Sequence, residues 1–120
     1  MAKSPPTLDS RLPLTPRVLL ILWGLHDGPQ HPYRLLKIAE DLGRGRVSIG
    51  PASLYEAIQA LRDKGLIAES AAPDDEPDPD PRRRYFKLTR LGRDVLHAEA
   101  NRVAELASDL RRARIVPRRP

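Results

Sequence analysis

The chain has 120 residues, which is enough for one domain with a single modest core. Hydrophobic residues make up 40% of it, but no apolar run approaches the ~20 residues of a membrane-spanning helix, so we expect no membrane partner. The lack of cysteine excludes disulfides and thiolate metal sites and agrees with a cytoplasmic location, while the formal net charge of +5 favours a polyanionic partner.

The chain begins with residues 1–13, a segment with three prolines and little apolar content. We predict a flexible arm there, which either reaches DNA or a partner subunit or is simply a disordered end. Thr15 and Pro16 then mark a helix start, because threonine caps free N–H groups and proline fits the first turn. The run VLLILWGL at 18–25 is apolar nearly all round, which predicts a helix buried on more than one side.

A second helix is predicted from His31 to Gly43, where glycine ends it. The predicted apolar face of this helix consists of Tyr33, Leu36, Ala39 and Leu42, with Leu35 and Ile38 beside it. The turn that follows contains Arg44 and Arg46, which could contact phosphates. It is not a nucleotide-binding loop, because no Gly-x-Gly-x-x-Gly or Gly-Lys-Ser/Thr motif follows a strand.

A third helix is predicted between Gly50 and Gly65, with Pro51 in its first turn and Gly65 in the left-handed position just past its end. Its narrow apolar stripe consists of Leu54, Ile58 and Leu61. The opposite side presents Ala52, Tyr55, Glu56 and Gln59. A small residue beside hydrogen-bonding side chains suits a face that lies against a DNA groove. An ordinary amphipathic surface helix is the alternative.

A short hairpin is predicted next, with strands at 65–69 and 82–89. The loop 73–81, PDDEPDPDP, is acidic and rich in proline, so we expect it to be extended and mobile. It would either project away from a duplex, which we favour, or shield the arginines that follow. Arg82, Arg83 and Arg84 could enter a minor groove, or they could merely balance the neighbouring acids.

The last predicted helix runs from Arg90, capped by Thr89, to about Ile115. Its apolar residues recur close to a heptad, which predicts packing on a second chain or, alternatively, on the core of its own subunit. Trp23, on the first helix, could also pack in that core or line a ligand pocket. The predicted dimer contacts are Leu19, Leu22, Trp23, Leu96, Val103, Leu106 and Leu110.

The runs LYEAIQALRDKGLI and RRRYFKLTRLGRDVL, in this order, resemble the DNA-binding region of the PadR family of bacterial transcriptional regulators. The resemblance covers roughly residues 14–107. It implies a winged helix-turn-helix regulator of the short-tailed branch, usually a repressor, whose DNA binding a small ligand modulates in some members. The sequence departs from the family in its acidic wing tip, and at Gln59 and Ala60, where basic residues are common.

The resemblance and the residues together predict a mainly α fold with a small β-hairpin. We divide it into an arm (1–13), a winged helix-turn-helix DNA-binding domain (14–89), a dimerisation helix (90–116) and a basic tail (117–120). Phosphate contacts would come from the arginines and Tyr55, and Gln59 would read adenine. The predicted DNA-binding residues are Arg44, Arg46, Ser53, Tyr55, Glu56, Gln59, Arg82, Arg83 and Arg84.

The expected function is therefore a homodimeric regulator of transcription that binds double-stranded DNA without a cofactor. An enzyme is not expected, because the three histidines form no i, i+4 pair and no other catalytic or metal-binding motif occurs. Two alternatives remain. One is a protein-interaction module with the acidic loop as its docking peptide, and the other is a small-molecule sensor that does not bind DNA.

Overall fold

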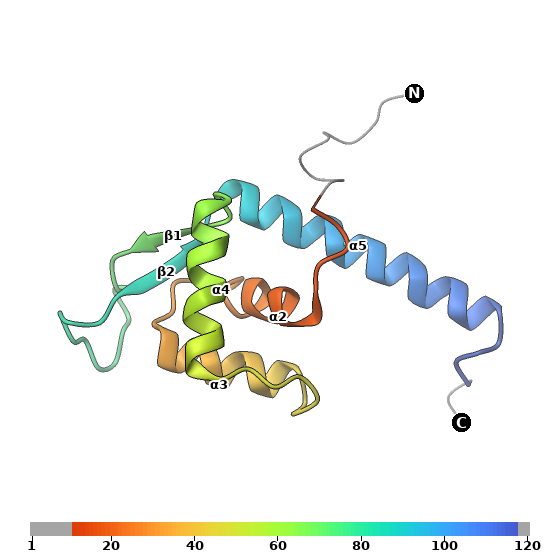
Figure 1. The fold of residues 1–120 in the computed structure, drawn as a ribbon, viewed down its shortest axis with the longest axis horizontal. Coiled ribbons are helices and arrows are strands. Elements are labelled where there is room, and N and C mark those ends of the chain that lie inside the picture. Colours follow the sequence, from red (N-terminus) through yellow and green to blue (C-terminus); the bar gives the residue numbers. More distant parts are fainter. Residues whose placement is uncertain (1–10, 118–120) are drawn as a thin grey trace.

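The computed structural model describes residues 11–117, so the basic tail beyond Pro117 and most of the predicted arm lie outside the described residues. Helices and a two-stranded hairpin follow one another in the predicted order (Figure 1). The elements are α2 (Pro16–Gly24), α3 (Pro32–Leu42), α4 (Pro51–Asp63), β1 (Ile67–Ser70), β2 (Tyr85–Leu88) and α5 (Arg90–Arg112). The prediction of a mainly α fold with a small hairpin is confirmed.

Side-chain caps fix where three of the helices begin. The Thr15 side chain accepts a hydrogen bond from the Val18 amide at 3.2 Å, and that of Thr89 accepts one from the Gly92 amide at 3.0 Å. His31 does the same for α3 through Nδ1, so this helix begins at Pro32 and not at His31 itself. Each cap satisfies an amide that the helix leaves without a partner.

The turns that follow α4 and α3 both contain residues in the left-handed conformation, but not always glycine. Gly65 has a φ of +77° and ends α4 in the left-handed conformation, as predicted. Gly43 does not, because the right-handed turn continues through it with a φ of −78°. The reversal falls instead on Arg44 and Gly45, with φ values of +56° and +70°. Arg44 therefore adopts a conformation that costs a non-glycine residue about 1 kcal/mol.

The hairpin pairs β1 with β2 in antiparallel register, with Ile67 opposite Leu88 and Ser70 opposite Tyr85. Both strands are shorter than predicted, since regular pairing stops where the loop between them begins. A third backbone segment joins at Gln30, whose amide and carbonyl both bond to Phe86 at 3.0 and 2.9 Å. This bridge ties the α2–α3 loop to the wing.

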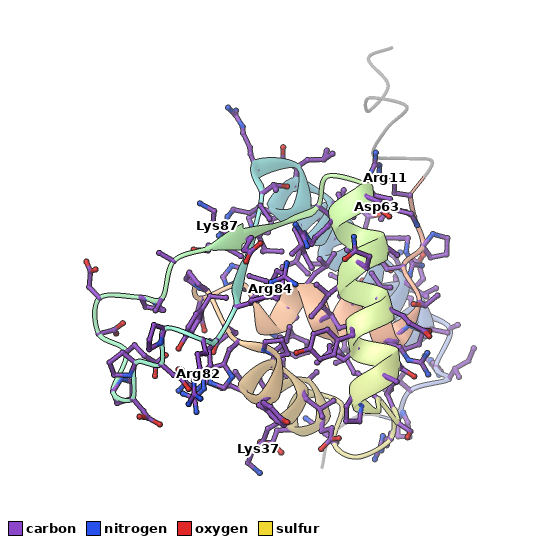
Figure 2. All side chains as sticks on the ribbon, turned by 60° about the vertical axis from the view of Figure 1, so that its left-hand side comes forward. Arg11, Lys37, Asp63, Arg82, Arg84 and Lys87 are labelled. Carbon is purple, nitrogen blue, oxygen red and sulfur yellow. The ribbon has the colours of Figure 1, made fainter. Side chains whose placement is uncertain are left out.

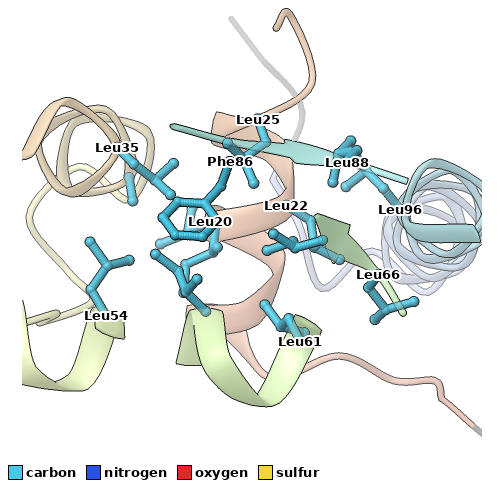
Figure 3. Close-up of a cluster of buried hydrophobic side chains, with 14 of the residues drawn as sticks. Leu20, Leu22, Leu25, Leu35, Leu54, Leu61, Leu66, Phe86, Leu88 and Leu96 are labelled. Carbon is cyan, nitrogen blue, oxygen red and sulfur yellow. The ribbon is translucent and has the colours of Figure 1, made fainter. Parts of the chain in front are cut away.

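The core surrounds α2, which other elements cover on more than one side, as the apolar run predicted. Phe86 lies among leucines from α2, α3 and α4 (Figure 3). The α4 stripe of Leu54, Ile58 and Leu61 is at most 3% exposed. Burying each of these side chains stabilises the fold by roughly 1.5–3 kcal/mol.

The predicted apolar face of α3 is rotated from the real one. Leu35 and Ala39 are fully buried against α2, whereas Tyr33 is 81% exposed. The apolar residues of this segment cover so broad a stripe that the pattern predicts a helix without fixing its rotation. Tyr33 also lies in the first turn, beside the helix end rather than over the core.

The end of the predicted arm is fixed to the body. Leu12 packs against the core, and Arg11 donates a hydrogen bond to the Lys64 carbonyl at 3.1 Å. The Leu14 amide donates to the carboxylate of Glu99 on α5 at 2.7 Å. The free arm predicted to reach residue 13 is therefore too long by at least the last three residues, 11–13.

Helix α5 packs on the body with its first turns and then extends past it (Figure 1). Its close approach depends on Gly92, where a Cβ atom would lie 2.0 Å from the Leu66 carbonyl oxygen. Further along, Glu99 is 1% exposed, and Arg102 and the Leu14 amide both donate to its carboxylate. Burial opposes ionisation of Glu99, but these hydrogen bonds prevail and lower its pKa.

Candidate nucleic-acid interface

Helices α3 and α4 and the turn between them form a helix-turn-helix, and α4 presents a polar face to solvent. Because Leu54 and Ile58 point into the core, the side chains of Ala52, Tyr55, Glu56 and Gln59 point outward and are exposed. The orientation predicted for this helix is correct. A face of this kind, free of other elements of the same subunit, can enter a groove of duplex DNA.

The start of α4 is open to an anion. Its N-cap is Gly50, which has no side chain to satisfy the first amides. The first turn carries no acidic residue, so the positive end of the helix dipole is not offset there. Ser53 is half-buried at this end and lines a groove of about 690 Å³ together with Arg17 and Arg46. These features favour a phosphate group beside Ser53.

Arg44 and Arg46, in the turn before α4, are exposed. Neither makes an ion pair with another side chain within residues 11–117. Both charges therefore remain available to a polyanion.

The three arginines of the wing are different, because each is bound to an acid. Arg82 lies out on the loop, while Arg84 lies between β2 and α4 (Figure 2). The guanidinium of Arg84 stacks 5.4 Å from the centroid of the Phe86 ring. The pairs are Arg82–Asp80, Arg83–Asp78 and Arg84–Glu69, with N–O distances of 3.3, 3.6 and 3.0 Å. In the unbound chain, these arginines balance neighbouring acids.

The acidic loop is not simply a mobile segment, because one of its acids, Glu76, is anchored. Whether the loop projects away from a duplex stays a prediction. The Glu76 side chain is 2% exposed and receives two hydrogen bonds from Arg34 of α3, at 2.9 and 2.8 Å. The Tyr85 hydroxyl donates a third at 3.0 Å, and the Asp78 amide a fourth at 3.3 Å. We call this set of contacts the Glu76 latch. It fastens the wing loop to the helix-turn-helix.

The Glu76 latch shifts the ionisation of its members. Hydrogen bonds from Arg34, against the effect of burial, lower the pKa of Glu76 to about 2. The pKa of Arg34 is raised, chiefly by the hydrogen bond to Glu76. Burial and then the Glu76 carboxylate raise the pKa of Tyr85. This pairing was not predictable from the sequence, since Arg34 and Glu76 are 42 residues apart and Glu76 is one of several loop acids.

His31 packs against Tyr85, a member of the Glu76 latch. Its ring meets that of Tyr85 edge-on at 5.5 Å between centroids, and its Nδ1 caps α3. Burial, followed by the charges of Arg34 and Arg83, lowers the pKa of His31. A neutral imidazole, with Nδ1 as an acceptor, fits this position.

The predicted dimer contacts divide into two groups. Leu22 and Leu96 are 0% and 5% exposed in the core of their own subunit, so their side chains are not accessible to a second chain. This corrects their assignment: Leu22 lies on the buried side of α2, and Leu96 lies on the part of α5 that packs on the body, although the heptad-like pattern continues beyond it. The remaining candidates are Trp23, Val103 and Leu106, at 48%, 39% and 48% exposed, with the partly buried Leu19 and Leu110.

Sequence reasoning missed several exposed residues near these surfaces. Tyr33 stands beside Tyr55 at the start of α3, and Arg17 reaches the Ser48 carbonyl at 3.3 Å beside the groove at α4. Ile115 and Val116, at 68% and 40% exposed, follow the end of α5. The only available signal for Tyr33 was its place in the first turn, where the helix can extend beyond the core.

Two kinds of feature are absent from residues 11–117. Residues 11–117 contain no group of three or more His, Cys, Asp or Glu side chains that could hold a metal ion. Within that same range, no helix has both the length and the apolar character needed to cross a bilayer.

One family model matches most of the chain. The family model of the transcriptional regulator PadR-like family matches residues 21–98. A protein of transposon Tn4556 from Streptomyces fradiae, with a mass of 37.1 kDa and described as uncharacterized, is 37% identical over 89 residues. The match covers 74% of this chain but 23% of that relative, so the chain spans less than a quarter of the relative's length.

Solved structures show the same fold. A PadR family transcription regulator from Clostridium difficile superposes with a TM-score of 0.63 at 19% identity, over 82% of this chain and 97% of that one. Bacillus subtilis PadR in complex with operator DNA superposes with a TM-score of 0.55 at 20% identity, over 68% of this chain and 44% of that one. These likenesses establish the winged helix-turn-helix architecture.

Proposed function

The chain belongs to the PadR-like family of transcriptional regulators, and from this premise we propose that it binds double-stranded DNA in a sequence-specific manner. It acts in the cytoplasm as a homodimer and represses transcription. The observation that carries the proposal is the polar face of α4, which is exposed next to an open helix start and two unpaired arginines.

In the proposed complex, α4 lies in the major groove. Gln59 suits adenine, because its amide can both accept from and donate to that base, and Ser53 and Glu56, on the same helix, are further candidates for base contacts. Tyr55, Arg44 and Arg46 bind phosphates and position the helix. A two-fold dimer delivers two copies of α4 to successive major grooves, ~34 Å apart along the duplex.

The wing contributes less to affinity than its three arginines suggest. Arg82, Arg83 and Arg84 must each exchange a carboxylate for a phosphate before they gain anything from DNA. The turn before α4 therefore supplies most of the electrostatic attraction.

The proposed dimer uses the apolar surface on the projecting part of α5 and the neighbouring side of α2. Trp23, Val103 and Leu106 expose large apolar groups there, and a second copy of the same surface would remove them from water. A small-molecule effector that tunes DNA binding belongs to the same proposal and would bind between the subunits, near α2 and α5.

The test is affinity for duplexes selected from a random library, measured by fluorescence anisotropy across a range of salt concentrations. Arg46→Ala should weaken binding by order 1 kcal/mol and reduce the slope of log affinity against log salt by about 1. Arg111→Ala is the matched control, because it removes the same charge at the far end of α5.

Equal affinities for Arg46→Ala and the unchanged protein would contradict the contact map. Failure to select any duplex would contradict DNA binding itself. A thermal shift with small molecules but no duplex binding would then favour a ligand sensor.

A further inference from the structure

A small apolar notch lies between the amino-terminal turns of α3 and α4, on the surface proposed to face DNA. Its volume is about 50 Å³. It is lined by Pro32, Tyr33, Leu36, Pro51, Leu54 and Tyr55. We call it the tyrosine notch, because Tyr33 and Tyr55 form its rim.

The rim of the tyrosine notch is unusually exposed for aromatic residues. Tyr33 is 81% and Tyr55 53% exposed, and neither hydroxyl has a hydrogen-bond partner among the described residues. A monomer gains nothing from holding two aromatic rings in water beside an apolar hollow. Two exposed rings beside an apolar hollow offer another molecule both an apolar contact surface and hydroxyl groups.

The charges around the tyrosine notch indicate what that molecule is. The first turns of α3 and α4 meet here, and neither carries an acidic residue. Lys37 lies one turn after Tyr33 on the same side of α3 and makes no ion pair within the described chain. Two helix starts and a free lysine attract phosphates to the edges of a hollow that is itself apolar. The occupant must therefore place an apolar group beside a phosphate backbone.

We propose that the tyrosine notch receives the C5-methyl group of a thymine. This inference rests on the proposed DNA binding and adds a second specificity element to it. The methyl group is the one apolar feature that base pairs present in the major groove, where α4 would lie. The methyl group lies on the side of the thymine nearest the backbone of its own strand. The tyrosine notch would lie at the same place, because α4 would be in the groove and the start of α3 would face the phosphates of that backbone.

The size of the tyrosine notch agrees with this occupant. The notch of about 50 Å³ accommodates a methyl group, since one water needs only about 10–15 Å³ of such space. With the methyl group seated, the rings of Tyr33 and Tyr55 flank it and their hydroxyls reach the adjacent phosphates. Gln59, four residues after Tyr55 on α4, would read a different base pair.

The experiment uses a selected duplex in which each thymine is replaced in turn by deoxyuridine, which removes only the methyl group. One position in each half-site should lose about four-fold in affinity, the equivalent of one buried methyl group at ~0.8 kcal/mol. Tyr33→Ala opens the notch and should bind the thymine and uracil duplexes equally. Tyr33→Phe keeps the ring and should retain the preference for thymine.

Three results would overturn the proposal: a consensus without thymine, no loss of affinity at any replaced thymine, or a thymine preference that persists in Tyr33→Ala. Because Tyr33 is exposed, its substitution should not change the melting temperature of the protein. Thermal melts of both variants check this. Failure of the proposed function looks different, since no duplex would then be selected at all.

Discussion

At the scale of single residues, the Glu76 latch makes the wing sensitive to acid. Because the pKa of Glu76 is about 2 in the folded chain and 4.5 without its partners, the folded state binds fewer protons than the unfolded state between these values. The stabilisation is complete above pH 4.5 and is lost as the pH falls from 4.5 toward 2. Arg34 stays charged throughout.

We therefore expect Glu76→Gln, which keeps the shape of the side chain, to lower the melting temperature at pH 7. The difference between the variant and the unchanged protein should shrink as the pH falls below 4.5. Thermal melts between pH 7 and pH 3 measure both. The latch would be refuted by a constant difference across this range. Asp74→Asn, at an exposed loop acid, is the control.

Single residues also mark what could be read from the sequence. The caps at Thr15 and Thr89 and the reversal at Gly65 were predictable, because each depends on neighbours within a few positions. The latch was not, because Arg34 and Glu76 meet only after the hairpin has folded back on α3. Nor did the sequence indicate that Arg44, not Gly43, would take the left-handed conformation.

At the scale of elements, α5 meets the hairpin at one point that admits no side chain. Gly92→Ala would place a Cβ atom 2.0 Å from the Leu66 carbonyl oxygen, which is backbone and cannot turn aside. We expect α5 to shift and the free energy of unfolding to fall by about 1–3 kcal/mol. Urea denaturation measures this, with Arg90→Ala, exposed in the same turn, as the control. A variant as stable as the unchanged protein would mean that the approach is looser than described.

The wing is the second element with a testable consequence. Glu69 holds Arg84 through two hydrogen bonds, at 3.0 and 3.1 Å, and so competes with phosphate. Glu69→Gln should free that charge and tighten duplex binding by about three-fold, since exposed pairs are worth less than ~1 kcal/mol. Anisotropy titrations measure the change. Weaker binding by Glu69→Gln would show that the pair positions Arg84 for DNA.

Elements were predicted better than their orientations. The stripe of α4 is narrow, so its inward and outward faces followed from spacing alone. The apolar stripe of α3 is broad, and spacing alone predicted that Tyr33 faces the core. In the structure its side chain is exposed. Part of the tyrosine notch was thereby hidden from sequence analysis.

At the scale of the whole molecule, the exposed apolar surface of α5 predicts the oligomeric state. Leu106→Glu would place a charge in the proposed dimer surface, at a cost of several kcal/mol. We expect it to convert the dimer to a monomer in light scattering at micromolar concentration. Ser108→Glu adds the same charge on the opposite side of the helix and should leave the dimer intact. A monomeric starting protein would reject this surface.

The sequence could predict that α5 has an apolar seam, but not where the subunit's own core ends. Leu96 belongs to that core, while Val103 and Leu106 lie beyond it. Spacing is identical on both sides of the boundary, so the boundary depends on how far the other elements reach along α5.

Glu99 lies near that boundary. Its carboxylate accepts a hydrogen bond from the amide of Leu14, in the segment before α2, and so joins this segment to α5. From Glu99 to the end of α5 at Arg112 the helix is ~20 Å long, at 1.5 Å per residue. In the proposed dimer, Glu99 therefore lies on α5 between the turns that pack on the body and the exposed Val103 and Leu106, which would meet the second subunit.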